Sequence, residues 1–146
     1  DLDSLADGKN VEDIMSHPAL SGKRVLIAED MAVNAQMLKQ MLHTTGVDAD
    51  VAGDGREALR LFSSSSNGYY DAILMDVKMP DMDGLEATKS IRGLSRADAS
   101  SVPIIALTSN DVESDMRKSL QAGMNAHLNK PVNPDEVYET LEKHIR

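Results

Sequence analysis

Several side chains that could take part in chemistry lie just after short apolar runs of this sequence. They are Glu29 and Asp30 after the first run, Asp76 after the third, Thr108 after the fourth and Lys130 after the fifth. Three carboxylates brought together repel one another unless a cation binds or some of them become protonated. Because these candidate ligand atoms are all oxygens and the sequence has no cysteine, we expect a hard divalent cation, Mg²⁺ or Mn²⁺.

The same groups are the parts needed to transfer a phosphoryl group onto a carboxylate. Mg²⁺ is usually held by one or two carboxylates, waters and a phosphate oxygen, so a third carboxylate remains free to react. Lys130 can serve as a point charge opposite the phosphoryl group, and Thr108 can donate its hydroxyl to a phosphoryl oxygen. Each of these residues alone is common in turns, so the prediction of phosphoryl transfer depends on their joint placement.

The elements that must position these groups are apolar runs alternating with amphipathic segments. The runs are residues 25–28, 48–51, 72–75, 104–107 and 126–128. Strict alternation of strands and helices predicts an α/β fold, with a parallel sheet covered on both faces. In such a sheet the ligand site lies beyond the carboxyl ends of the strands, where the reactive residues are expected. Each amphipathic segment has apolar residues at helical spacing, which form a stripe along one side of a predicted helix. The stripes are Val33, Met37 and Met41 with Leu38 and Leu42; Ala58, Leu59 and Phe62; Leu85, Thr88 and Ile91; Val112, Met116 and Leu120; and Val137, Leu141 and Ile145.

Length and composition suit one domain of ordinary globular type. The chain has 146 residues and a formal net charge of −9, which argues against nucleic acid or an anionic membrane as a direct partner. It has no apolar stretch of membrane-spanning length and no basic, apolar leader, so we expect a cytoplasmic protein. With so few aromatic residues, the nine methionines are expected to share in filling the core. Residues 1–21 are interpreted as a linker or the tail of a preceding domain, and residues 22–146 as the domain itself.

Residues 22–146 resemble the receiver domain of two-component response regulators. The matching motifs are "VLIAED" (25–30), "DAILMDVKMPDMDG" (71–84), "PIIALTS" (103–109) and "GMNAHLNKP" (123–131). The resemblance implies a flavodoxin-like doubly wound (βα)5 sandwich of three layers, with the strand order 2-1-3-4-5. It also implies a cis peptide bond before Pro131.

The resemblance assigns a role to each reactive residue. Asp76 would accept a phosphoryl group from the phosphohistidine of a histidine kinase or a histidine phosphotransfer protein. Glu29, Asp30, Asp76 and the backbone carbonyl of Lys78 would bind Mg²⁺. Thr108 would be the switch hydroxyl, and Lys130 would be the counter-charge of the phosphoryl group.

Three further residues are expected to modulate the response. His127 occupies the switch position, although a half-buried core imidazole is an equally good interpretation. The ammonium of Lys78 and, more weakly, Asn110 are expected to affect loss of the phosphoryl group. Phosphorylation would change the surface formed by residues 112–122, 126–128 and 133–145, through which a second copy of the chain could also bind.

Several origins and functions remain open on the sequence alone. The motifs favour the C-terminal receiver of a hybrid sensor histidine kinase, and a stand-alone single-domain regulator is the alternative. A Mg²⁺-dependent phosphatase with an aspartate nucleophile is a rival from another class. That chemistry needs a second carboxylate two residues after the first, where this sequence has Lys78. The receiver is therefore not expected to be a separate catalyst.

Overall fold

The fold is built on one five-stranded parallel sheet. In the computed structural model, which describes residues 10–109 and 113–145, the strands lie in the order β2-β1-β3-β4-β5. This order, together with the alternation of strands and helices, confirms the predicted fold. The strands are β1 (Arg24–Ala28), β2 (Asp48–Ala52), β3 (Ala72–Asp76), β4 (Ile104–Thr108) and β5 (Ala126–Asn129).

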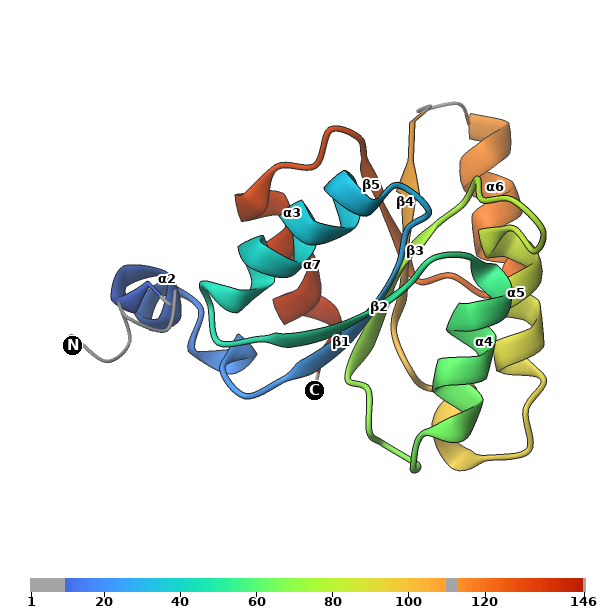
Figure 1. The fold of residues 1–146 in the computed structure, drawn as a ribbon, viewed down its shortest axis with the longest axis horizontal. Helices are drawn as coiled ribbons and strands as arrows, with labels where there is room; N and C mark the ends of the chain where they lie inside the picture. Colours follow the sequence, from blue (N-terminus) through green and yellow to red (C-terminus); the bar gives the residue numbers. More distant parts are fainter. Residues whose placement is uncertain (1–9, 110–112, 146) are drawn as a thin grey trace.

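Helices cover both faces of the sheet, which gives the domain three layers (Figure 1). One core lies between the sheet and α3 and α7, and a second lies on the opposite face against α4 and α5, beside α6. The α-helices are α2 (Val11–Ser16), α3 (Ala32–His43), α4 (Gly55–Ser64), α5 (Gly84–Arg92), α6 (Glu113–Ala122) and α7 (Pro134–His144). Two short 3₁₀ helices are η1 (Pro18–Leu20) and η2 (Ala97–Ala99).

The central strands are apolar because both of their faces are covered. Side chains alternate along β1, so that Val25 and Ile27 belong to the core under α3 and α7, whereas Leu26 and Ala28 belong to the core under α4 and α5. Strands β3 and β4 are buried along their whole length. This burial fixes the positions of the two residues that end them, Asp76 and Thr108.

Polar caps set the beginnings of α5 and α7. The Asn133 carboxamide oxygen accepts hydrogen bonds from the backbone N–H groups of Asp135 and Glu136, and Pro134 is the first residue of α7. The Asp83 carboxylate accepts from the backbone N–H of Glu86 in the first turn of α5. These caps fix the residues at which the two helices begin.

The prediction that the apolar residues of α3 form a single stripe is wrong. Val33 and Met37 are 70% and 61% exposed, whereas Leu38 and Leu42 are buried. A turn of 3.6 residues separates Met37 from Leu38 by about 100°, so the apolar residues of α3 form two stripes, and only one of them faces the sheet.

Two other expectations about the core need the same correction. Leu120 of α6 is exposed, and Ser119 is buried in its place. The methionines divide between the core and the surface. Met75, Met79 and Met124 are buried, whereas Met15, Met31 and Met37 are exposed.

Residues before 22 include two ordered elements, α2 and η1, which lie at the end of α3 that is distant from the carboxyl edge of the sheet (Figure 1). Leu20 of η1 is fully buried in the core beneath α7. The boundary between a linker and the domain at residue 21 stays a prediction. Among the described residues, no helix has both the length and the apolar character needed to cross a bilayer.

Candidate functional site

An acidic cluster with one ammonium group lies at the carboxyl edge of the sheet. Lys130 Nζ donates a hydrogen bond to Asp76 Oδ2 at 2.7 Å and another to Glu29 Oε1 at 3.0 Å. Glu29 is 1% exposed and Asp76 is 5% exposed, whereas Asp30 lies at the surface. The structure thus brings together the ends of β1 and β3 with the residue that follows β5.

These carboxylates fit a divalent cation. One carboxylate oxygen from each of Glu29, Asp30 and Asp76 lies within 4.8 Å of the other two. Glu29 Oε2 is buried and has no hydrogen-bond partner within the described chain. A buried carboxylate oxygen without a donor is unfavourable by about 1–3 kcal/mol or more, and a cation would remove that penalty. All the available ligand atoms are oxygens, which suits Mg²⁺.

The electrostatics of the cluster indicate a shortage of positive charge. Burial and the neighbouring Glu29 carboxyl raise the pKa of Asp76 above its ordinary value, against the opposing effect of Lys130. Burial alone would also raise the pKa of Glu29, but its interactions with Asp76 and Lys130 outweigh that effect and lower the pKa. The single ammonium therefore does not offset the burial of Asp76, and a bound cation would supply further positive charge.

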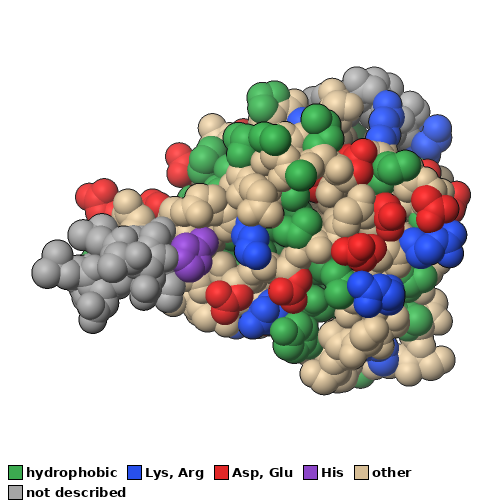
Figure 2. All heavy atoms as spheres, in the orientation of Figure 1, with side chains coloured by type: hydrophobic (Ala, Val, Ile, Leu, Met, Phe, Trp, Pro, Cys, Tyr) green, Lys and Arg blue, Asp and Glu red, His purple; other side chains and the backbone are tan. Residues whose placement is uncertain are grey.

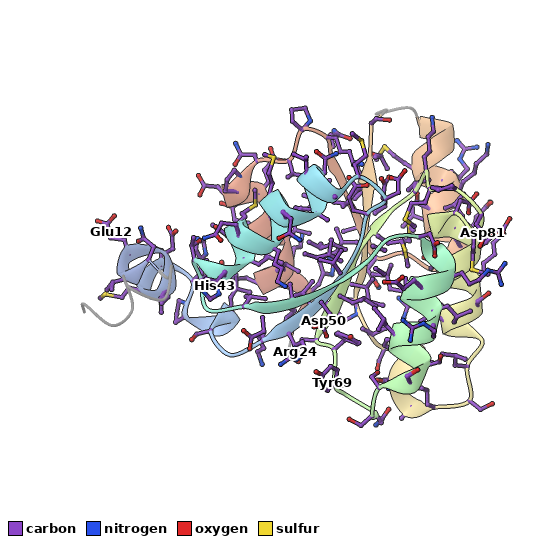
Figure 3. The ribbon with its side chains drawn as sticks, viewed as in Figure 1. Glu12, Arg24, His43, Asp50, Tyr69 and Asp81 are labelled. Atoms are coloured by element: carbon purple, nitrogen blue, oxygen red, sulfur yellow. The ribbon has the colours of Figure 1, made fainter. Side chains whose placement is uncertain are left out.

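The loop after β3 holds Asp76 in place through its backbone. The Lys78 N–H donates to Asp76 Oδ1 at 3.2 Å, and the Gly84 N–H donates to the Val77 carbonyl oxygen at 2.9 Å. A Cβ on Gly84 would lie 2.2 Å from the carbonyl oxygen of Asp76, so only glycine allows α5 to begin this close to β3. In the same loop, Asp81, which is labelled in Figure 3, has a positive φ of 65°. It forms an ion pair with Arg56 of α4.

Two other predicted residues lie on the neighbouring strands β4 and β5. Thr108 is buried at the end of β4, and its hydroxyl donates to Asn129 Oδ1 at 3.1 Å. His127 is half-buried on β5 and lies opposite Ala106 in the register with β4. The Lys130–Pro131 peptide bond is cis. Asn110 lies outside the described residues.

The sequence analysis did not identify Asn129, whose side-chain oxygen accepts the hydrogen bond from the Thr108 hydroxyl. Asn129 is the last residue of β5, and it is paired in register with Thr108 at the end of β4. The rule that located the other residues, a polar side chain at the end of a strand, applies equally to Asn129.

The order of these motifs along the chain is that of a known family. Residues 25–142 match the family model of the response regulator receiver domain. The chain belongs to this family. The acidic cluster of the receiver domain and its neighbouring threonine and lysine thus occupy the edge of the sheet that the sequence indicated.

Relatives of the receiver domain are found in hybrid histidine kinases. It is 38% identical, over 125 residues, to hybrid signal transduction histidine kinase I of Dictyostelium discoideum. That match covers 84% of this chain and 7% of the kinase, so the chain spans a small part of this relative.

Solved structures of receiver domains share its fold. The receiver domain of a sensor histidine kinase from Pseudomonas aeruginosa PAO1, which has a magnesium ion in its active-site cleft, is 39% identical with a TM-score of 0.74. The match covers 85% of this chain and 98% of that one. The receiver domain of Saccharomyces cerevisiae Ssk1, solved with the histidine phosphotransfer protein Ypd1, is 31% identical with a TM-score of 0.74, covering 84% and 88% of the two chains.

Proposed function

We propose that this receiver domain takes a phosphoryl group from a phosphohistidine onto Asp76 in a reaction that requires Mg²⁺. The observation that supports it best is the unbalanced cluster itself, with three carboxylates, one ammonium and a buried Glu29 oxygen that has no partner among the described residues. Glu29, Asp30 and Asp76 would hold the ion, with the backbone carbonyl of Lys78 as a further ligand. When bound, Mg²⁺ would neutralise charge on the carboxylates and on the transferred phosphoryl group.

In the proposed reaction Asp76 is the nucleophile. One of its carboxylate oxygens forms a bond to phosphorus while the bond between phosphorus and the donor imidazole nitrogen breaks, and the imidazole keeps that electron pair. Lys130 already contacts Asp76, so its ammonium can follow the charge onto the phosphoryl oxygens. Loss of the phosphoryl group to water regenerates the carboxylate.

The proposed response to phosphorylation begins at Thr108. Its hydroxyl would leave Asn129 and donate to a phosphoryl oxygen, because an anionic acceptor forms a stronger hydrogen bond than a neutral amide. His127 lies on the neighbouring strand and would then move inward. This shift would favour a second arrangement of the surface formed by α6, β5 and α7.

A protein donor would find an apolar surface next to the site. Met31, Val33 and Met37 of the α3 region are exposed, and Figure 2 shows hydrophobic side chains gathered over this helix. Met37 lines both a groove of about 920 Å³ between α3 and α7 and a pocket of about 330 Å³ that reaches Glu29 and Lys130. We propose that a histidine kinase or phosphotransfer protein docks here, and that the domain comes from a hybrid sensor kinase. Hydrogen exchange with such a donor present should show protection of α3.

The acceptor function can be tested without a protein donor. Acetyl phosphate and Mg²⁺ should label the wild-type chain with one phosphoryl group, detected by intact mass. Asp76→Asn should prevent labelling, because a carboxamide cannot form the acyl phosphate. Asp81→Asn is the matched control, since this aspartate lies five residues away in an exposed ion pair with Arg56 and should leave labelling unchanged.

Two outcomes would overturn the proposal. One is stoichiometric labelling of the Asp76→Asn variant, which would place the phosphoryl group on another residue. The other is labelling of the wild type that is unchanged when Mg²⁺ is removed with a chelator. Steady turnover of a phosphomonoester would instead favour the phosphatase rival.

A further inference from the structure

The segment that precedes β1 is bound to the domain at several points. The Asn10 N–H donates to the Thr44 carbonyl oxygen at 3.0 Å, and the Gly22 N–H donates to the Gly46 carbonyl oxygen at 2.9 Å. Leu20 is fully buried in the core beneath α7. Residues 10–20, which we call the strap, thus cross the C-terminal end of α3, as Figure 3 shows with Glu12 on α2 and His43 on α3. The strap lies outside the residues that match the family model.

His17 joins the strap to α7. Its Nδ1 is hydrogen-bonded to Glu142 Oε1, and its ring lies 4.9 Å from the ring of Tyr138. Both partners belong to α7, one turn apart, so the imidazole fits a particular position of that helix. The His17 side chain is 16% exposed, so a shift of α7 would remove most of its contacts.

Tyr138 extends this contact to α3. Its hydroxyl donates to the Met41 carbonyl oxygen at 2.7 Å and lies 3.0 Å from Thr44 Oγ1. The ring is 4% exposed. The strap, α3 and α7 therefore meet at one small cluster, formed by His17, Thr44, Tyr138 and Glu142.

A short path connects this cluster to the acidic site. Lys130, which binds Asp76 and Glu29, precedes the first residue of α7, Pro134, by four positions. Between them, Val132 packs against the same core that contains Leu20. A change of partner at Lys130 therefore acts on the segment from which α7 begins.

We propose that the strap is an intramolecular brake, docked on α7 through His17 and released when Asp76 is phosphorylated. The inference rests on the proposed acceptor function. In the unphosphorylated state Lys130 binds the carboxylates of Asp76 and Glu29, and α7 then lies where His17 of the strap can contact it. When Lys130 turns to a phosphoryl group, movement at the start of α7 breaks the fit with His17. Because coupling between two sites is reciprocal, a docked strap disfavours the phosphorylated state by the same factor.

The coupling can be measured in both directions on the full chain. Beryllofluoride with Mg²⁺ is the probe, as a stable mimic of the phosphoryl group. We expect amide hydrogen exchange in residues 10–20 of the wild type to become about fivefold faster or more when the probe binds, within the usual range for coupled sites. In His17→Ala, exchange in these residues should already be fast without the probe, and the probe should bind more tightly by a similar factor.

A matched pair of α7 variants separates the contact from a general change in helix charge. Glu142→Ala removes the partner of His17 and should behave like His17→Ala. Glu139→Ala removes the same charge from an exposed position on the same helix and should leave strap exchange and probe affinity unchanged.

The outcomes distinguish the brake from the acceptor function. If the wild type binds the probe while exchange in residues 10–20 stays unchanged, the brake is wrong and the acceptor function stands. Equal probe affinity in His17→Ala and wild type would have the same meaning. If the wild type does not bind the probe at all, the acceptor function is overturned, and the coupling with it.

Discussion

Two clusters of buried charge lie at opposite edges of the sheet. Arg96 and Asp98 form an ion pair at η2, just before β4 begins, whereas Lys130 lies among the carboxylates after the strands end. The first pair has one charge of each sign. The second cluster has three carboxylates and one ammonium. The comparison shows how a cluster that stabilises the fold differs from one that can bind a ligand.

The Arg96 cluster is internally complete. Its guanidinium donates to both carboxylate oxygens of Asp98 and to the carbonyl oxygens of Phe62, Ser65 and Ser66 at the end of α4. The planar fork of arginine suits such a set of fixed acceptors. Nothing in this arrangement requires a further ion or ligand.

The Lys130 cluster is incomplete in a specific way. The ammonium satisfies one oxygen of Asp76 and one of Glu29, but Glu29 Oε2 has no donor among the described residues. Excess negative charge and an unpaired buried oxygen lower stability unless a cation binds. We therefore expect this cluster, and not the Arg96 cluster, to respond to Mg²⁺.

Among the variants of the two clusters, Lys130→Met is expected to have the largest effect on stability. Removing the ammonium leaves two buried carboxylates without a counter-charge, which should lower the free energy of unfolding by about 3 kcal/mol when no divalent ion is present. Mg²⁺ should restore much of the loss, because it supplies the missing charge. Urea unfolding with and without Mg²⁺ measures both values. A loss of stability that Mg²⁺ leaves unchanged would contradict a cation site at these carboxylates.

A smaller effect is expected from Asp98→Asn in the other cluster. The amide keeps an acceptor but loses the charge, so stability near neutral pH should fall by about 2 kcal/mol. Mg²⁺ should make no difference. Asp81→Asn, in an exposed pair with Arg56, is the control and should leave the melting temperature unchanged.

The Asp98 effect should depend on pH with a definite sign. Burial raises the pKa of Asp98, but hydrogen bonds from Arg96 and from the Gly68 N–H outweigh it and place that pKa below 3.8. The unfolded chain therefore takes up the proton first, so the stabilisation is present above about pH 4 and is lost as the pH falls through the folded-state pKa. The difference in the free energy of unfolding between wild type and Asp98→Asn should become smaller below pH 4. A difference that stays constant would contradict the ionic contribution.

The sequence predicted the residues of the Lys130 cluster better than those of the Arg96 cluster. Asp76, Thr108 and Lys130 follow apolar runs, and a parallel sheet places the ends of such runs at one edge. Arg96 lies between α5 and η2, and its carbonyl acceptors lie about thirty residues earlier in the chain. Backbone acceptors have no sequence signal, so this cluster could be found only in the folded structure.

Two other limits of the prediction have physical causes. A helical period alone does not say which of two apolar stripes faces the sheet, so the exposure of Val33 and Met37 could not be predicted. His17 and Glu142 come from opposite ends of the chain, and neither belongs to a motif. The strap depends on tertiary contacts of this kind, so a composition rich in acidic residues suggested only a linker.

The smallest effect is expected from Lys78→Ala, next to the Lys130 cluster, and it concerns the rate at which the phosphoryl group is lost. Lys78 follows Asp76 by two residues; it is exposed and lines a shallow pocket of about 470 Å³ with Asp30 and Lys118. An exposed ammonium contributes about 1 kcal/mol or less to such an interaction, so the phosphorylated variant should lose its phosphoryl group up to about fivefold faster. Shortening the side chain also opens a path for water.

The measurement is the decay of the labelled protein after acetyl phosphate is removed, followed by intact mass. Lys89→Ala, on the exposed surface of α5, is the matched control and should decay at the wild-type rate. Added salt should bring wild type and Lys78→Ala closer together if charge causes the difference, because screening weakens exposed charges most. If the difference persists at high salt, the Lys78 side chain acts by excluding water. Equal decay rates at low salt would show that Lys78 acts neither through its charge nor by excluding water. Loss of the phosphoryl group would then depend only on the residues that contact Asp76.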